Sequence, residues 1–357
     1  NVDIYRSPNK NNLSSNRTIG VSRTNLEFFK KEILDINKDA WKINKIEIYS
    51  EKSKDEKILN FEKEREPLFF MIRNNQVYES LNYKLKKSKF CKSKIIKGNN
   101  FYQKLFDQNK YNLIINCDPK NFISRKFFSR KIDKNYNNYA YTTILKHNTI
   151  RNNVAIQIFT KYGPIAFLPI SRNETSVVYS LDDCKKKYDE NKIIELIKKY
   201  NPKFKIKNIN KLDKFQLNSS NIRNYYYKNI VAFGDSLHKI HPLAGQGFNM
   251  TIRDIQVISE IIQDRISLGL ELDPSIFYQF EKKTKHFNFL FSKGVDLIYE
   301  FFNFERKVKN QSLNRIIKFF GENKKLNNII IKFANRGINI WLLLESIIIK
   351  IIKSIST

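Results

Sequence analysis

Short runs rich in hydrophobic residues, the first of which alternates with polar positions, recur in the first half of the chain and are typical of β-strands. These runs lie at residues 2–5, 46–49, 58–61, 68–72 and 111–117, and further ones fall between 139 and 182. Pro164 and Pro169 indicate bends between the strands of that last region. Helical spacing is found at residues 22–36, where Ser22 is the expected cap, and at 77–85 and 189–200.

The pattern changes at residue 229. Residues 229–233 predict a buried strand that runs directly into Gly234 and Asp235. After a loop, isoleucines recur at helical spacing up to Gly269, which we expect to end that helix. From Pro274 onward the pattern predicts helices almost throughout. The predicted order is therefore mixed α/β, a β-rich insert, α/β again, and then helices.

The most informative segment is 234–249, with the sequence GDSLHKIHPLAGQGFN. A strand that leads through a loop into a helix places free backbone N–H groups at the helix start, where they suit an anion or a carbonyl oxygen. Gly245 and Gly247 allow the main chain to approach a planar ligand, and Asp235 can accept hydrogen bonds from sugar-like hydroxyls. The alternative is a connecting loop whose glycines only make turns, although the whole chain has just 10 glycines.

Charge and composition exclude some classes of protein. The 357 residues include 65 Lys and Arg against 35 Asp and Glu, which gives a net charge of +30. The basic residues are spread from end to end rather than grouped on one element, so we expect no nucleic-acid partner. A hydrophobic fraction of 41% excludes a disordered chain.

Cysteine and histidine spacing predicts neither disulfides nor a metal site. The three cysteines, Cys91, Cys117 and Cys184, lie far apart, which favours a reducing compartment. His238 and His241 have a spacing that can bind a metal on a helix, but they precede the predicted helix and lack a third ligand.

Segment 234–249 resembles the second flavin-binding motif of the FAD-dependent aromatic-ring monooxygenases, GD-x-x-H-x-x-x-P-x-x-GQG-x-N. Its His-Pro pair and the following Ala-Gly-Gln-Gly are most similar to the ubiquinone-biosynthesis hydroxylase branch. Residues 16–22 are similar to that branch's D-x-R-x-x-A-L-S segment, and residues 162–169 to its G-P-x-A-x-L-P segment. Residues 112–118 resemble the strand before the family's DG motif, so the resemblance covers about residues 1–335.

The resemblance implies an α/β fold like that of p-hydroxybenzoate hydroxylase. It has a Rossmann-like FAD-binding domain, an inserted β-sheet substrate domain and a helical C-terminal region. The FAD-binding domain would comprise residues 1–40, 72–134 and 222–270. The substrate domain would comprise residues 41–71 and 135–221, and the C-terminal region residues 271–357.

Several positions depart from the family pattern. The first motif, GxGxxG, is absent, and residues 2–6 align with the second strand of the dinucleotide fold. We therefore expect the first strand, phosphate loop and helix to precede Asn1, and this chain alone to bind FAD weakly. Arg6 stands where the family has an acidic residue, Pro119 replaces the glycine of the DG motif, and Arg73 stands where an acidic residue often precedes Asn.

The resemblance also assigns cofactor contacts. They are Arg17, Gly234, Asp235, Pro242, Gly245, Gln246, Gly247, Phe248 and Asn249. Asp235 would hold the ribityl chain, the segment 245–249 would face the pyrimidine side of the flavin, and Arg17 would lie near the ring. Pro242 would shape the wall where substrate and oxygen meet. No side chain is singled out as a general base, so the catalytic residues are left unassigned.

The implied activity is hydroxylation of the aromatic ring of a prenylated ubiquinone precursor with FAD, NAD(P)H and O2. The expected location is the cytoplasm, peripheral at the inner face of the membrane, with anionic lipid and other quinone-biosynthesis proteins as partners. Residues 341–355 read as an amphipathic helix whose Lys350 and Lys353 face such lipid, or as a helix that closes the core. The alternatives are a hydroxylase of a soluble phenol and a catalytically silent scaffold component of quinone synthesis.

Overall fold

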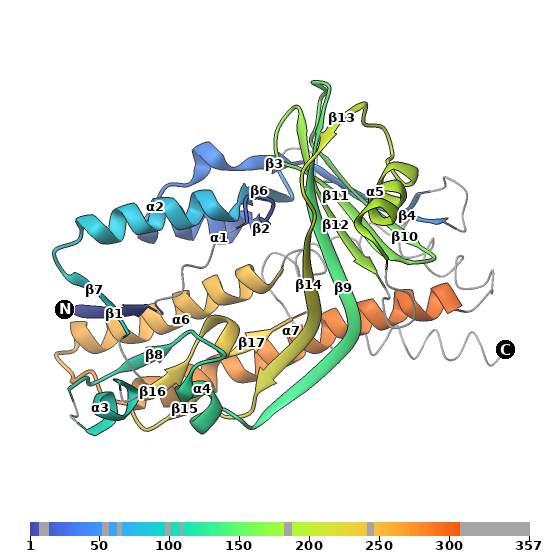
Figure 1. The fold of residues 1–357 in the computed structure, drawn as a ribbon. Coiled ribbons are helices and arrows are strands. Elements are labelled where there is room, and N and C mark those ends of the chain that lie inside the picture. The colour runs from blue at the N-terminus through green and yellow to red at the C-terminus, as the bar shows by residue number, and fades with distance from the viewer. Residues whose placement is uncertain are drawn as a thin grey trace.

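The fold is a mixed α/β arrangement with one large sheet, three small sheets and two long helices (Figure 1). The computed structural model describes residues 1–6, 14–51, 57–62, 66–96, 101–107, 110–181, 188–240 and 246–307. No helix among these residues is both long enough and apolar enough to cross a membrane.

The large sheet has nine strands in the order β17-β14-β9-β12-β11-β10-β4-β5, and β13 pairs with β9. Its strands are β4 (Lys45–Ser50), β5 (Lys57–Glu62), β9 (Lys131–His147), β10 (Val154–Thr160), β11 (Gly163–Pro169), β12 (Glu174–Leu181), β13 (Ile206–Ile209), β14 (Asp213–Ile222) and β17 (His238–Lys239). Helix α5 (Glu190–Lys199) begins at its cap Asp189 and buries Ile193 and Ile197 in a cluster with strand residues such as Val177. That cluster is the core of this half of the molecule.

Three small sheets complete the strand structure. They are β1 (Val2–Arg6) with β7 (Cys91–Ile95), then β2 (Thr18–Ser22) with β6 (Phe69–Arg73) and β3 (Trp41–Ile43), and β15 (Tyr226–Tyr227) with β16 (Ile230–Ala232) and β8 (Ile114–Asn116). The short helices beside them are α1 (Arg23–Phe28), α2 (Asn74–Lys87), α3 (Phe101–Asp107) and α4 (Phe122–Phe127), and α1 continues as a π-helical turn at Phe29–Ile33. The β1–β7 and β8–β16 pairs are parallel, as in a dinucleotide-binding fold.

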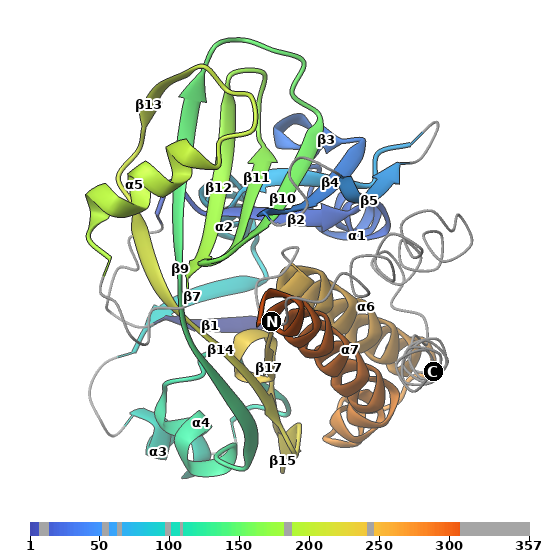
Figure 2. The same ribbon diagram turned by 90° about the vertical axis from the view of Figure 1, so that its right-hand side faces the viewer.

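Helices α6 (Gln246–Ser267) and α7 (Ser275–Lys307) lie side by side, and α7 passes beneath the large sheet (Figure 2). Ile258 and Ile261 of α6 share a core cluster with Phe277 and Phe280 of α7. Gly269 ends α6 with φ of +66°, and the N–H of Leu270 donates to the carbonyl of Arg265, which is a Schellman cap.

Most elements predicted from the pattern are present, including the strands at 2–5, 46–49, 58–61 and 68–72 and the helix capped by Asp189. Two predictions were wrong. Pro164 lies inside strand β11 rather than at a bend, because the turn falls at residues 161–162 and Gly163 takes φ of +137°. The strand predicted at 111–117 is limited to β8. The predicted segment 341–355 lies outside the described residues, and the division into domains stays a prediction.

Candidate functional site

Two parallel strands end together at the site. Strands β8 and β16 pair with Ala232 opposite Asn116, and the N–H of Phe233 donates to the carbonyl of Asn116 at 2.8 Å. The Asn116 side chain donates to the hydroxyl oxygens of Ser124 at 2.8 Å and Ser236 at 3.3 Å. This buried network holds the turn that follows β16 against the carboxyl end of β8.

The turn after β16 presents an unpaired carboxylate. Residues Gly234–Ser236 form one 3-10 turn, and Gly234 takes φ of +58°, which a glycine adopts without strain. A Cβ placed on Gly234 would lie 3.9 Å from Cγ2 of Thr251, so the turn lies beside the first turns of α6. Asp235 is exposed, and no described residue forms a hydrogen bond or ion pair with its carboxylate.

Lys239 lies within electrostatic range of the Asp235 carboxylate and of two further cations, Lys120 and Arg17. Partial burial lowers the pKa of Lys239, the Asp235 carboxylate raises it, and the positive charges of Lys120 and Arg17 lower it further. Arg17 also lies over the ring of Phe215, with its guanidinium carbon 5.9 Å from the ring centroid. The surroundings of Asp235 therefore favour an anionic ligand that also carries hydroxyl groups.

Asn249 anchors the start of α6. Its Oδ1 accepts from the backbone N–H of Ser22 at 2.9 Å and from Nδ2 of Asn25 at 2.8 Å, while its Nδ2 donates to the carbonyl of Gly20 at 2.8 Å. The residue is buried, with 3% of its surface exposed. The side chain of Asn249 thus makes three hydrogen bonds to protein groups, and it fixes the helix start on β2 and α1.

Of the other described residues in the Gly-Gln-Gly segment, one packs in the hydrophobic core and the rest lie at the candidate site. Phe248 packs in the apolar cluster of α1 and α2, with its ring centroid 6.3 Å from that of Phe29. A Cβ on Gly247 would lie 3.7 Å from Cγ1 of Ile240. Oε1 of Gln246 is buried and has no hydrogen-bond partner among the described residues. The predicted contacts Pro242 and Gly245 lie outside the described residues.

The histidine of the motif is part of a buried network between three elements. Nε2 of His238 lies 2.5 Å from Oδ2 of Asp254, and both side chains are 1% exposed. Nδ2 of Asn288 donates to the other carboxylate oxygen of Asp254 at 3.0 Å. These contacts tie β17 to α6 and α7, so His238 positions the loop rather than facing a ligand.

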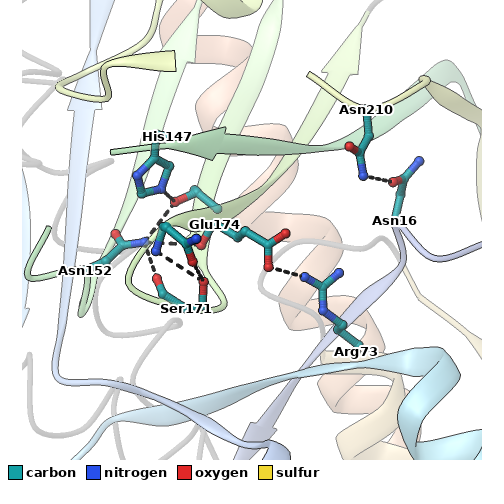
Figure 3. A network of polar contacts seen from close by, with 9 residues as sticks. Asn16, Arg73, His147, Asn152, Ser171, Glu174 and Asn210 are labelled. Atoms are coloured by element: carbon teal, nitrogen blue, oxygen red, sulfur yellow. Dashed lines mark hydrogen bonds and ion pairs between the residues drawn. The ribbon is translucent and has the colours of Figure 1, made fainter. Parts of the chain in front are cut away.

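A second polar network joins the small β2–β6–β3 sheet to the large sheet (Figure 3). Nη2 of Arg73 lies 2.6 Å from a carboxylate oxygen of Glu174. The buried Asn16 donates to the carboxylate of Asp213 at 2.9 Å, and its Oδ1 accepts from Asn210 at 3.2 Å. Because Asn16 is tethered in this way, the next residue, Arg17, is held between the two sheets.

The sequence pattern identified the motif but not most of the residues that hold it in place. It singled out neither Asn116 and Ser124 nor Asn25, and it predicted Ser22 as the cap of α1, which is confirmed, but not as a partner of Asn249. These are single polar residues with no local repeat, and their partners lie far away in the sequence. The departure noted at Arg73 was the one available signal, because a cation at that position requires a carboxylate such as Glu174.

Comparison with known proteins places this site in a family context. A scan of protein-family models finds no match. The chain is 23% identical over 343 residues to the ubiquinone biosynthesis monooxygenase COQ6 of Schizosaccharomyces pombe, covering 76% of this chain and 71% of that protein. It is 25% identical over 350 residues to COQ6 of Caenorhabditis elegans, covering 80% of this chain and 76% of that protein. The chain is a distant relative of the ubiquinone-biosynthesis hydroxylases.

Other comparisons agree with this relationship. The 3-demethoxyubiquinol 3-hydroxylase of Escherichia coli is 27% identical over 153 residues, which is 41% of this chain and 39% of that protein. Among solved structures, p-nitrophenol 4-monooxygenase of Pseudomonas putida superimposes with a TM-score of 0.71 at 12% identity, covering 94% of this chain and 92% of that one. A probable FAD-dependent monooxygenase of Pseudomonas aeruginosa gives 0.63 at 10% identity, with coverage of 88% and 92%. The predicted fold class is confirmed as that of FAD-dependent monooxygenases.

Proposed function

We propose that this protein is an FAD-dependent monooxygenase that hydroxylates the aromatic ring of a quinone precursor with O2. The observation that carries the proposal is the exposed carboxylate of Asp235 at the carboxyl end of β16, beside the start of α6, which no described residue pairs. The relationship to ubiquinone-biosynthesis hydroxylases supports the reaction class. A prenylated precursor as substrate and NAD(P)H as reductant are the finer parts of the proposal, and they follow from the resemblance of segment 234–249.

The described residues fit FAD on its ribityl and ring side. Asp235 has unused acceptor oxygens for ribityl hydroxyls, and the buried Oε1 of Gln246 lacks the donor that an N–H of the flavin pyrimidine would supply. Arg17, Lys120 and Lys239 add positive charge around an anionic cofactor. We propose Gly234, Gly247, Phe248 and Asn249 as the frame of this site, with Pro242 and Gly245 as further contacts.

The residues of the chain position the cofactor and stabilise charge. When bound, FAD supplies the redox chemistry that activates oxygen. The backbone N–H groups at the start of α6 would stabilise negative charge on the ring of a bound flavin. Asn249 holds that helix start in place through Ser22 and Gly20, so the donors stay fixed while the charge develops.

Flavin binding is the first test. FAD is titrated into the purified chain and the dissociation constant is measured for the wild type, for Asp235→Asn and for the control Asp264→Asn, which removes an exposed carboxylate of α6. Loss of charge-assisted hydrogen bonds at Asp235 weakens FAD binding by about tenfold or more, while the control variant binds as the wild type does. Equal affinities of all three proteins would remove Asp235 from the site.

Turnover is the second test. We expect a prenylated phenol to stimulate NAD(P)H oxidation by the FAD-loaded protein, and mass spectrometry to find a product with one added oxygen atom. Oxidation without an oxygenated product would overturn the hydroxylase proposal. A folded protein that binds the phenol without consuming NAD(P)H would instead support the alternative of a scaffold component.

A further inference from the structure

One buried cation of α6 has donors that no described residue accepts. Arg253 follows Asn249 by one helical turn, and its Nε and Nη2 atoms are buried without a hydrogen-bond acceptor among the described residues. In a guanidinium group these two nitrogens share one edge, which is the edge that binds a carboxylate side-on. An unpaired buried donor costs free energy, so an oxygen that completes this edge binds favourably.

Two aromatic rings of α7 hold the guanidinium in place. Its central carbon lies 4.6 Å from the ring centroid of Phe287 and 4.7 Å from that of Phe291. Contacts of this kind are made with the ring faces, which offer no carboxylate or carbonyl oxygen to the guanidinium donors. The two rings therefore orient Arg253 without satisfying its donors.

The carboxylates of Asp254 and Asp296 have hydrogen-bond partners other than Arg253. Asp254, the next residue, is bonded to His238 and Asn288, and Asp296 of α7 accepts from the hydroxyl of Tyr136. Burial lowers the pKa of Arg253 to about 10, and Asp254 opposes that change. Arg253 therefore remains a cation at neutral pH, and no described carboxylate neutralises it.

The side chains that pack beside this cation are apolar. Ile240, Met250, Phe291 and Val295 form one buried cluster, against which Phe287 packs. Ile240 also faces Gly247, at 3.7 Å from the position of a Cβ there. One cation among apolar side chains suits a ligand with an apolar body and a single negative charge, whereas a phosphate needs more donors.

We propose that Arg253 binds a negatively charged oxygen on the aromatic ring of the substrate, through the edge formed by Nε and Nη2. This oxygen belongs either to a phenolate or to a carboxylate on the ring, and both groups carry one negative charge. The identification of this ligand as the substrate rests on the proposed function, whereas the binding of an aromatic anion at Arg253 does not. Arg253 is thus a specificity residue for the charge of the ligand.

Three probes that differ only in one group test this. They are p-nitrobenzoate, p-nitrophenol above its pKa, and neutral p-nitroanisole, titrated calorimetrically into the full chain with and without FAD. Arg253→Gln weakens binding of at least one of the two anions by about tenfold or more, and it changes p-nitroanisole binding by less than about twofold because no charge is lost there. If the substitution weakens binding of p-nitrobenzoate, the group that Arg253 binds is a carboxylate. If it weakens binding of p-nitrophenolate, the group is a phenolate.

Three further variants keep the test decisive. Arg253→Lys keeps the charge but loses the paired edge, so it also weakens anion binding, and it decides the matter if the glutamine variant does not fold. Arg265→Gln removes a cation from the far end of the same helix and leaves probe binding unchanged. Arg253→Met, without ligand, has a Tm equal to or above that of the wild type, because it removes a buried charge that lacks a partner.

The outcomes separate the two proposals. The inference fails if the wild type does not prefer the anions to p-nitroanisole, or if loss of Arg253 weakens all three probes equally. It also fails if the variants bind the anions normally and only the Tm falls, since Arg253 would then serve stability alone. Anion binding that depends on Arg253 in a protein that binds no flavin would refute the monooxygenase proposal and leave this inference standing.

Discussion

His238 and Asp254 form a fully buried pair, with Nε2 and Oδ2 separated by 2.5 Å. His238 lies in β17, after the turn at Gly234–Ser236, and Asp254 lies in the third turn of α6, where Asn288 of α7 donates to its other oxygen. One carboxylate thus joins the motif to both long helices. The pair therefore ties β17 to the helix that follows the Gly-Gln-Gly segment.

Removal of Asp254 is therefore expected to destabilise the fold. Asp254→Ala leaves His238 and the amide of Asn288 buried without partners, and we expect a loss of about 3 kcal/mol in the free energy of unfolding. Urea denaturation followed by circular dichroism measures this. Asp264→Ala, at an exposed position of the same helix, is expected to change stability by less than about 0.5 kcal/mol. Equal losses in the two variants would contradict a structural role of the pair.

Asn249 and Asn25 are expected to be energetically coupled. Both are buried and their side chains are hydrogen-bonded at 2.8 Å. Either alanine variant leaves buried groups unsatisfied, so each costs about 1–3 kcal/mol. A double-mutant cycle in urea is expected to give a coupling energy of at least about 0.5 kcal/mol. Additive effects would show that Asn249 anchors α6 independently of Asn25.

The ion pair between Arg73 and Glu174 is expected to orient the two sheets that it joins (Figure 3). Both side chains are about a quarter exposed, at 24% and 23%, so solvent screens the pair only in part. We expect a coupling energy of about 1 kcal/mol in a cycle with Arg73→Gln and Glu174→Gln. The coupling is expected to decrease with added salt. A salt-independent value would point to packing rather than charge.

The reactivity of Cys117 reports on its distance from Asp235. Desolvation and, to a lesser degree, the negative charge of Asp235 together raise the pKa of the Cys117 thiol to about 11. Because the thiolate is the nucleophile, alkylation by iodoacetamide stays slow at neutral pH and accelerates as the pH approaches 11. Mass spectrometry of the Cys117 peptide follows the reaction.

Neutralising the Asp235 carboxylate tests its effect on Cys117 alkylation directly. Asp235→Asn is expected to shift the Cys117 profile to lower pH, because the thiolate no longer faces a negative charge. Cys91 in the same samples serves as the internal control. An unchanged Cys117 profile in the variant would show that the two groups lie farther apart in solution.

Part of the strand structure could not be predicted, for identifiable reasons. Strand β9 begins at Lys131, in a stretch rich in polar residues with no apolar alternation, and it is held there by its pairing with β14. Strand β7 carries lysines at alternate positions and pairs with β1 alone among the described residues. In both cases the backbone partner, rather than side-chain burial, stabilises the strand.

The sequence by itself determined the strand, turn and helix around Gly234 and Asp235, since burial periodicity, a left-handed glycine and a helix start are local properties. Only the tertiary structure decided what surrounds them. The buried pairing of His238 with Asp254 and the open edge of Arg253 depend on how α7 packs against α6. No local pattern encodes which polar group finds a partner, because hydrogen bonds between distant residues form only once the chain has folded.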